Sequence, residues 1–202
     1  MHSVAVRRTA AAILAAACAF TTISCASDDA KPVVAVGADS STESVLLAEI
    51  YSQALARTGT ESTVVTGLTT PLADLDAGRI AVLPARNGAL LDRWNPASPA
   101  RKPDEVVAAV NAALPQGLSV TDAADGTDLR PRDALPGPDY TFRAQNILAL
   151  YRTGIFDRQQ LKKLNYVAGE LTTEGLIESI NQIETGTRPA DAARSWLDAH
   201  SL

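Results

Sequence analysis

The N-terminal half of the chain alternates short apolar runs with amphipathic segments, and this order constrains the fold more than any other feature. Three runs have the length and the apolar or β-branched character of strands: residues 32–37, 62–66 and 79–83. A helical segment over residues 40–58 joins the first two runs, and a shorter one over 71–77 joins the last two. This order predicts a parallel α/β sheet with right-handed crossovers.

The second half of the chain reads mainly as helix. Residues 103–114 have Pro at the first helical position and acidic residues in the first turn, and 117–121 follow as a fourth strand. Residues 122–138 are rich in Asp, Gly and Pro, which indicates a loop. Helix starts are marked by capping-box spacing or by Pro, and for the whole chain these signals are Ser40 with Glu43, Asp157 with Gln160, Thr172 or Thr173, and Pro189.

The first 24 residues have the pattern of a bacterial secretion signal. Arg7 and Arg8 precede the apolar run 9–19, which is too short for a membrane span, and small residues come directly before Cys25. This placement resembles a lipobox, in which the cysteine is lipidated and becomes the first residue of the mature protein. The alternative is ordinary cleavage that leaves Cys25 unmodified.

Removal of residues 1–24 takes away two arginines and no acidic residue, so the formal net charge changes from −5 to −7. An acidic surface disfavours nucleic acid as a partner, because binding to phosphates needs clustered Lys and Arg. The remaining chain has one histidine, His200, and one cysteine, Cys25. A catalytic triad would depend on that terminal histidine, and a zinc site of Cys and His ligands cannot be assembled. We therefore predict no enzyme activity, no metal and no cofactor, with catalysis by carboxylates alone as the remaining enzymatic alternative.

Four stretches carry a family resemblance. Residues 36–43 read Val-Gly-Ala-Asp-Ser-Ser-Thr-Glu, and 75–80 read Leu-Asp-Ala-Gly-Arg-Ile. Further on, 145–152 read Gln-Asn-Ile-Leu-Ala-Leu-Tyr-Arg, and 164–173 read Leu-Asn-Tyr-Val-Ala-Gly-Glu-Leu-Thr-Thr. In this order they resemble the glycine betaine, choline and carnitine (osmoprotectant) substrate-binding proteins of ABC importers, over most of the chain after the signal peptide.

The resemblance implies a single lobe of the type II periplasmic-binding-protein kind, an α/β fold with a mainly parallel sheet and flanking helices. The family inserts a second lobe after the first part of this one, and a lobe needs on the order of 100 residues. The interval here is far shorter, so the partner lobe is expected to be missing. The expected organisation is a signal peptide (1–24), a tether (25–31), the first part of the substrate-binding lobe (32–121), a linker in place of the second lobe (122–142), and C-terminal helices that complete the same lobe (143–202).

The resemblance also implies a ligand site at the carboxyl edge of the sheet, where open α/β sheets bind ligands. Arg86 stands where the family has an aromatic residue, and a guanidinium repels the quaternary ammonium that an aromatic face attracts. Alternatively, Arg86 contacts an anionic ligand or an acidic partner, or it is an exposed loop arginine without a role in binding. Trp94 is a candidate to replace the missing aromatic residue. We expect betaine to bind weakly or not at all, with a Kd above roughly 1 mM. The predicted ligand-binding residues are Ser41, Thr42, Thr69, Arg86 and Asn87.

The function implied by the resemblance is capture of a small solute for an ABC permease. The protein would be lipid-anchored through Cys25 on the outer face of the cytoplasmic membrane. One alternative is an envelope lipoprotein that has lost ligand binding and acts through protein partners. Another is a decayed gene product without a function.

Overall fold

The computed structural model describes residues 33–124 and 143–202. The predicted signal peptide, the lipidation site at Cys25 and most of the predicted linker lie outside the described residues. In the part of the chain that is described, no helix has both the length and the apolar character needed to cross a membrane.

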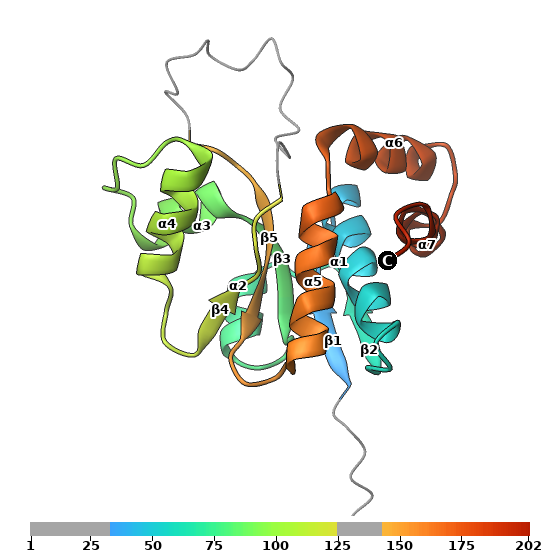
Figure 1. The fold of residues 1–202 in the computed structure, drawn as a ribbon, viewed down its shortest axis with the longest axis horizontal. Helices are drawn as coiled ribbons and strands as arrows, with labels where there is room; N and C mark the ends of the chain where they lie inside the picture. The colour runs from blue at the N-terminus through green and yellow to red at the C-terminus, as the bar shows by residue number, and fades with distance from the viewer. Residues whose placement is uncertain (1–32, 125–142) are drawn as a thin grey trace, which may run out of the picture. The chain divides into compact units, whose positions relative to one another are not determined.

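A five-stranded sheet forms the centre of the fold, with strands β1 (Val34–Gly37), β2 (Ser62–Val65), β3 (Val82–Arg86), β4 (Leu118–Val120) and β5 (Ile147–Arg152). Their spatial order is β2–β1–β3–β5–β4 (Figure 1). β1 pairs in parallel with β2 and β3, and β5 runs antiparallel to β3 and β4. The sheet is therefore mixed, with two parallel and two antiparallel pairings and four of its five strands in one direction, and the predicted α/β lobe is confirmed.

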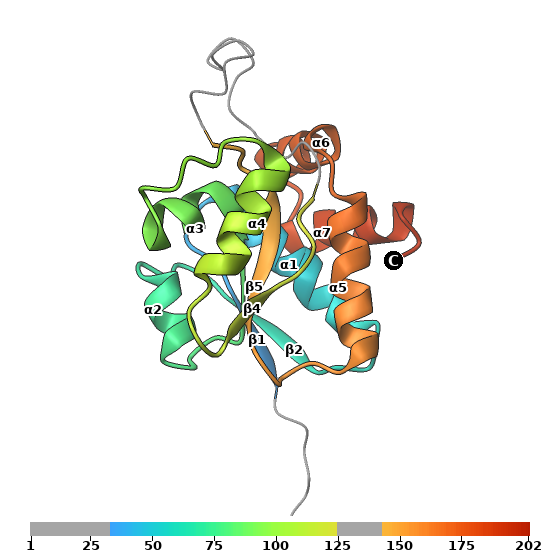
Figure 2. The ribbon, with the colours of Figure 1, turned by 60° about the vertical axis from the view of Figure 1, so that its left-hand side comes forward.

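Helices cover both faces of this sheet: α1 (Thr42–Ala56), α2 (Pro71–Asp76), α3 (Asn87–Trp94), α4 (Pro103–Ala113), α5 (Arg158–Glu170), α6 (Thr173–Glu184) and α7 (Pro189–Ala199). Figures 1 and 2 show α2, α3 and α4 on one side of the strands, with α1 and the three C-terminal helices on the other. α1 packs against α5, α6 and α7. The C-terminal helices thus bury their apolar faces on the helix that follows the first strand.

Side-chain alternation along β5 divides the core into two clusters. Ile147, Ala149 and Tyr151 face the cluster with α1, whereas Leu148 and Leu150 face the cluster with α2, α3 and α4. Such alternation follows from the two-residue period of a strand. Because both faces are covered, the strand is apolar and buried up to its last residue, Arg152.

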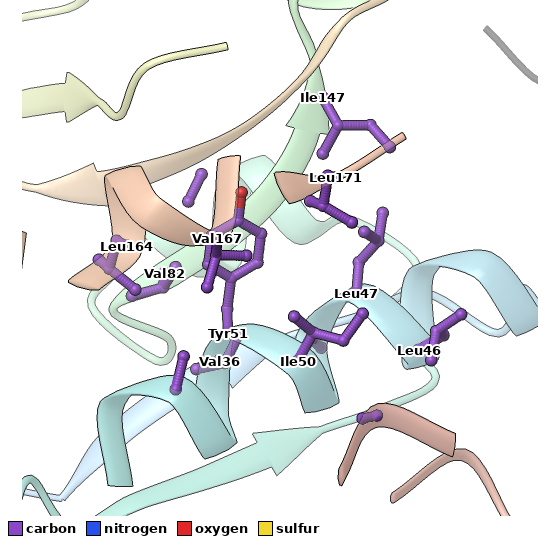
Figure 3. Packing of buried hydrophobic residues seen from close by; sticks show 14 of the residues in the cluster. Val36, Leu46, Leu47, Ile50, Tyr51, Val82, Ile147, Leu164, Val167 and Leu171 are labelled. Carbon is purple, nitrogen blue, oxygen red and sulfur yellow. The ribbon is translucent and has the colours of Figure 1, made fainter. Parts of the chain in front are cut away.

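Tyr51 lies at the centre of the first cluster. Figure 3 shows its ring among Val36, Val82, Leu164 and Val167, which come from two strands, β1 and β3, and from α5. The side chain is completely buried, and this burial raises the pKa of the Tyr51 hydroxyl well above its usual value. A single α1 side chain thereby joins the sheet to the C-terminal part of the chain.

Two predicted strand assignments are wrong. The region 143–202 was predicted to contain helices only, yet it supplies β5, because an apolar run without polar alternation fits a buried helix as well as a strand. The third strand was predicted over 79–83 and ends at Arg86 instead. The strand passes through Pro84, which lacks an N–H. It can do so because β3 pairs with β1 at Val82, opposite Val36, and this pairing ends before Pro84.

Candidate functional site

The carboxyl ends of β1, β2 and β3 bring three loops to one edge of the sheet. The Ala38 N–H donates to the Val65 carbonyl (2.8 Å), and the Leu68 N–H donates to the Ala38 carbonyl (3.0 Å). At Gly37 an added Cβ would lie 2.4 Å from Ile80 Cδ1, so any larger residue at the end of β1 would require the Ile80 side chain to move. The two hydrogen bonds of Ala38 hold the loops after β1 and β2 together.

Ser41 caps the first helix at this edge. The Ser44 N–H donates to Ser41 Oγ (3.2 Å), and the Ser41 N–H donates to a carboxylate oxygen of Asp39 (2.7 Å). The predicted capping box of Ser40 with Glu43 is therefore wrong by one residue, since Asp39 and Ser44 provide a competing set of partners. Glu43 is left available for an interaction with another element.

Two predicted threonines lie near this cap: Thr42 follows Ser41 in the chain, and Thr69 lies in a loop that is tied to the end of β1. Thr42 is the first residue of α1 and is half-buried, whereas Thr69 is exposed in the loop between β2 and α2. That loop is tied to the end of β1 through Leu68. Both hydroxyls are therefore placed at the carboxyl edge, together with the cap of α1.

Arg86 pairs with Glu43 across the edge. Its Nη2 lies 2.6 Å from Glu43 Oε1, and its Nη1 donates to the Gln145 carbonyl (3.2 Å). Both charged side chains are about three-quarters buried, at 25% and 24% exposed. The arginine therefore joins the end of β3 to the start of α1 and to the segment before β5. Its charge is largely balanced by the carboxylate.

Asn87 is completely buried beside this pair. Its N–H donates to the Asn146 carbonyl (3.0 Å), and its Oδ1 accepts from the Asn146 N–H (2.9 Å). Its Nδ2 has no hydrogen-bond partner within residues 33–124 and 143–202. Asn87 thus docks the start of α3 on the segment that leads into β5, and it also keeps one unused donor.

Trp94 lies at the opposite end of α3 from Asn87. The two residues are seven positions apart in the helix, which corresponds to about 10 Å along the axis. Trp94 is half-buried and packs on the cluster with α2, α3 and α4. This position favours a core role for Trp94 over replacement of the missing aromatic residue.

The structure brings Ser41, Thr42, Arg86 and Asn87 together at the ends of β1 and β3. The sequence reasoning did not assign Glu43 or the Gln145–Asn146 pair to this edge. The one sequence signal that could have placed them there is that Gln145 and Asn146 belong to a stretch that resembles the family. Their partners depend on β5, which the pattern did not reveal. Hydroxyls and a balanced ion pair make this edge of the sheet polar, whereas Asn87 is completely buried and contributes no surface to it.

Comparison with known proteins identifies the fold. No protein-family model matches the sequence, and no curated protein matches it either. Among solved structures, a glycine betaine/carnitine/choline ABC transporter protein superposes with a TM-score of 0.71 at 14% identity, covering 83% of this chain and 98% of that chain. Apo YehZ from Escherichia coli superposes with a TM-score of 0.70 at 13% identity, with the same coverage of 83% and 98%. The described lobe therefore shares its fold with these proteins, and the resemblance inferred from the sequence is confirmed at the level of the fold.

Proposed function

We propose that this protein is the extracytoplasmic substrate-binding lipoprotein of an ABC importer for osmoprotectants of the glycine betaine and choline type. The observation that carries the proposal is the fold, which is shared with a glycine betaine/carnitine/choline ABC transporter protein at a TM-score of 0.71. The fold supports a role in binding a solute and gives no support for catalysis. The site would be the polar carboxyl edge that holds Ser41, Thr42, Thr69, Arg86 and Asn87.

The ion pair of Arg86 with Glu43 changes the electrostatic argument drawn from the sequence. A free guanidinium would repel a quaternary ammonium, but the carboxylate 2.6 Å away offsets much of that field. Weak binding is still expected, because the ion pair takes the place of an aromatic face and supplies no cation–π attraction. A hydroxyl or carboxylate of the solute would form hydrogen bonds with the hydroxyls of Thr42 and Thr69.

The same ion pair favours a second candidate function. Arg86 is occupied by Glu43 and by the Gln145 carbonyl, and Asn87 is completely buried. Two of the five proposed ligand residues are therefore engaged within the protein itself. We would expect ligand residues to be engaged within the protein in this way in an envelope lipoprotein that no longer binds solute and acts through protein partners.

The variant Arg86→Tyr tests the solute-binding proposal. It introduces a ring and releases the Glu43 carboxylate, and both changes favour a quaternary cation. We expect affinity for betaine and choline to rise about two- to fivefold. Isothermal titration of the full-length protein with betaine, choline and carnitine measures this change.

The matched control is Arg93→Tyr, which makes the same substitution on the exposed surface of α3. It is expected to leave the affinities unchanged. If neither the wild-type protein nor Arg86→Tyr binds any of the three solutes, the transport proposal is wrong and the second candidate function remains.

The proposed anchor has its own test. Stable attachment needs more than one acyl chain, so diacyl modification at Cys25 is the expected form. Cys25→Ala should release the protein from the membrane fraction into the medium. A variant that stays in the membrane fraction would contradict the proposed lipidation.

A further inference from the structure

Helix α5 carries a positively charged surface on a protein that is acidic as a whole. Arg158 and Lys162 are exposed at a spacing of four residues, and Lys163 beside them is half-buried. Tyr166, four residues after Lys162, is also exposed. Residues 158–169 contain no acidic residue, although the net charge of the chain is −5. We call Arg158, Lys162, Lys163 and Tyr166 the α5 face.

The three cations of the α5 face are not neutralised by the protein. Within residues 33–124 and 143–202, no carboxylate lies at ion-pair distance from Arg158, Lys162 or Lys163. Exposed arginines elsewhere do pair with a nearby acid, as Arg188 does with Asp191 (2.6 Å). The charge of the α5 face is therefore available to an anionic partner.

Large apolar side chains are exposed beside these cations. In the described part of the chain four such side chains are exposed, and three of them are Tyr166 on α5, Ile155 in the turn before α5, and Val33 at the start of β1. Lys162 Nζ lies 5.3 Å from the centre of the Tyr166 ring. Tyr rings are enriched where membranes meet water, because the ring enters the headgroup layer while the hydroxyl stays hydrated. Basic and apolar groups together favour a lipid surface over a purely ionic partner.

The start of α5 and the start of β1 lie at the same edge of the sheet. The Arg152 N–H donates to the Ala81 carbonyl (3.2 Å), and the Ala81 N–H donates to the Ala35 carbonyl (2.7 Å). The end of β5 is therefore level with the start of β1, and Figures 1 and 2 both show the start of α5 at this lower end. This edge is opposite to the proposed solute site.

The proposed anchor limits how far this edge can be from the membrane. Cys25 is eight positions before Val33, so the chain between them spans at most about 29 Å. That length is comparable with α5 itself, whose 13 residues extend over about 20 Å. An anchored lobe would therefore have its β1 end, and α5 with it, within reach of the lipid headgroups.

We propose that the α5 face docks on the surface of an anionic phospholipid bilayer. Arg158, Lys162 and Lys163 contact the headgroup phosphates, and the Tyr166 ring lies in the headgroup layer. The inference rests on the proposed lipid anchor, to which a basic surface adds a second membrane signal. Docking gives the lobe one orientation on the membrane. It leaves the proposed solute site uncovered, because no residue of that site is on α5.

Lipid nanodiscs that contain a spin-labelled lipid test the docking, because the label broadens amide signals of residues close to the bilayer. The full-length, ¹⁵N-labelled protein is mixed with discs of phosphatidylcholine alone or with about 30% phosphatidylglycerol. We expect broadening along residues 155–166 on the anionic discs only. About 1 M salt should remove it, since the Debye length is then about 3 Å. No broadening along 155–166, or equal broadening on neutral discs, would overturn the proposal.

Two matched double variants separate the α5 face from a general effect of charge. Arg158→Gln with Lys162→Gln should reduce the broadening at least about fivefold. Arg93→Gln with Lys102→Gln removes the same residue types from the exposed surface of α3 and from the N-cap of α4, and should leave it unchanged. Circular dichroism establishes that each variant is folded. Equal loss in both variants, or no loss in the first, would contradict docking through α5.

Docking and solute binding fail separately in these measurements. A protein that docks through α5 but shows no response to betaine would contradict the proposed solute-binding function alone. A protein that binds betaine at the carboxyl edge but shows no broadening along residues 155–166 would contradict the docking alone.

Discussion

At Gly88 the first turn of α3 approaches the segment before β5 too closely for any side chain. An added Cβ would lie 2.4 Å from the Ala144 carbonyl oxygen and 2.3 Å from Gln145 Nε2. The glutamine can rotate, but the backbone oxygen cannot move without disturbing the pairing of Asn146 with Asn87. Gly88→Ala should therefore lower the free energy of unfolding by about 1–3 kcal/mol. Urea denaturation of the full-length protein measures this loss.

The matched control is Gly169→Ala on α5. A Cβ there meets nothing within 4 Å, so the better helix propensity of Ala should raise stability by up to about 1 kcal/mol. Opposite signs for the two substitutions are the expected result. A Gly88→Ala protein within about 0.5 kcal/mol of the wild type would show that the contact with Ala144 relaxes easily.

Residue chemistry at the proposed site was only partly predictable from the sequence. Arg86 was recognised as a cation in place of a ring, but its pairing with Glu43 joins residues 43 positions apart. The local capping rule assigned Glu43 to the helix start with Ser40. Asp39 and Ser44 displaced that pairing through hydrogen bonds that the spacing rule does not consider.

Among the elements, α4 has a charged N-terminus that makes its stability depend on pH. The N–H groups of Arg101 (3.1 Å) and Lys102 (3.3 Å) donate to the Glu105 carboxylate and hold its pKa below the usual value. A lowered folded pKa means that the ionised carboxylate stabilises the folded state above the unfolded pKa of about 4.3. That contribution is lost as the pH falls through the lower, folded pKa.

Glu105→Gln isolates this effect, because the amide keeps an acceptor oxygen and loses the charge. The variant should be less stable than the wild type at pH 7. The difference should shrink below pH of about 4.3 and disappear once Glu105 is protonated in the folded protein. Urea denaturation at a series of pH values gives both curves. A difference independent of pH would contradict a role for the charge.

Helix boundaries were more predictable than strands, since their signals are local. The capping box of Asp157 and Gln160 is confirmed by two reciprocal bonds, at 2.7 and 2.9 Å, and Pro189 opens α7 as predicted. β5 has no comparable signal. Its identity as a strand follows from pairing with β3 and β4, which are distant in the sequence.

For the molecule as a whole, the C-terminal part completes the packing that the N-terminal part begins. β5 lies between β3 and β4, and α5, α6 and α7 pack on α1. The family resemblance implied that these helices complete the same lobe, but their apolar faces did not reveal that α1 is the helix they cover. The two ends of the described chain therefore depend on each other for their cores, and the proposed solute site lies where their segments meet.

Titration of the full-length, ¹⁵N-labelled protein with glycine betaine tests the proposed site most directly, because amide shifts detect weak binding and also locate it. We predict saturable shifts at Ser41, Thr42, Thr69, Arg86 and Asn87, with a Kd above roughly 1 mM. The absence of saturable shifts up to about 50 mM, or saturable shifts confined to residues away from this edge, would contradict the proposed solute-binding function.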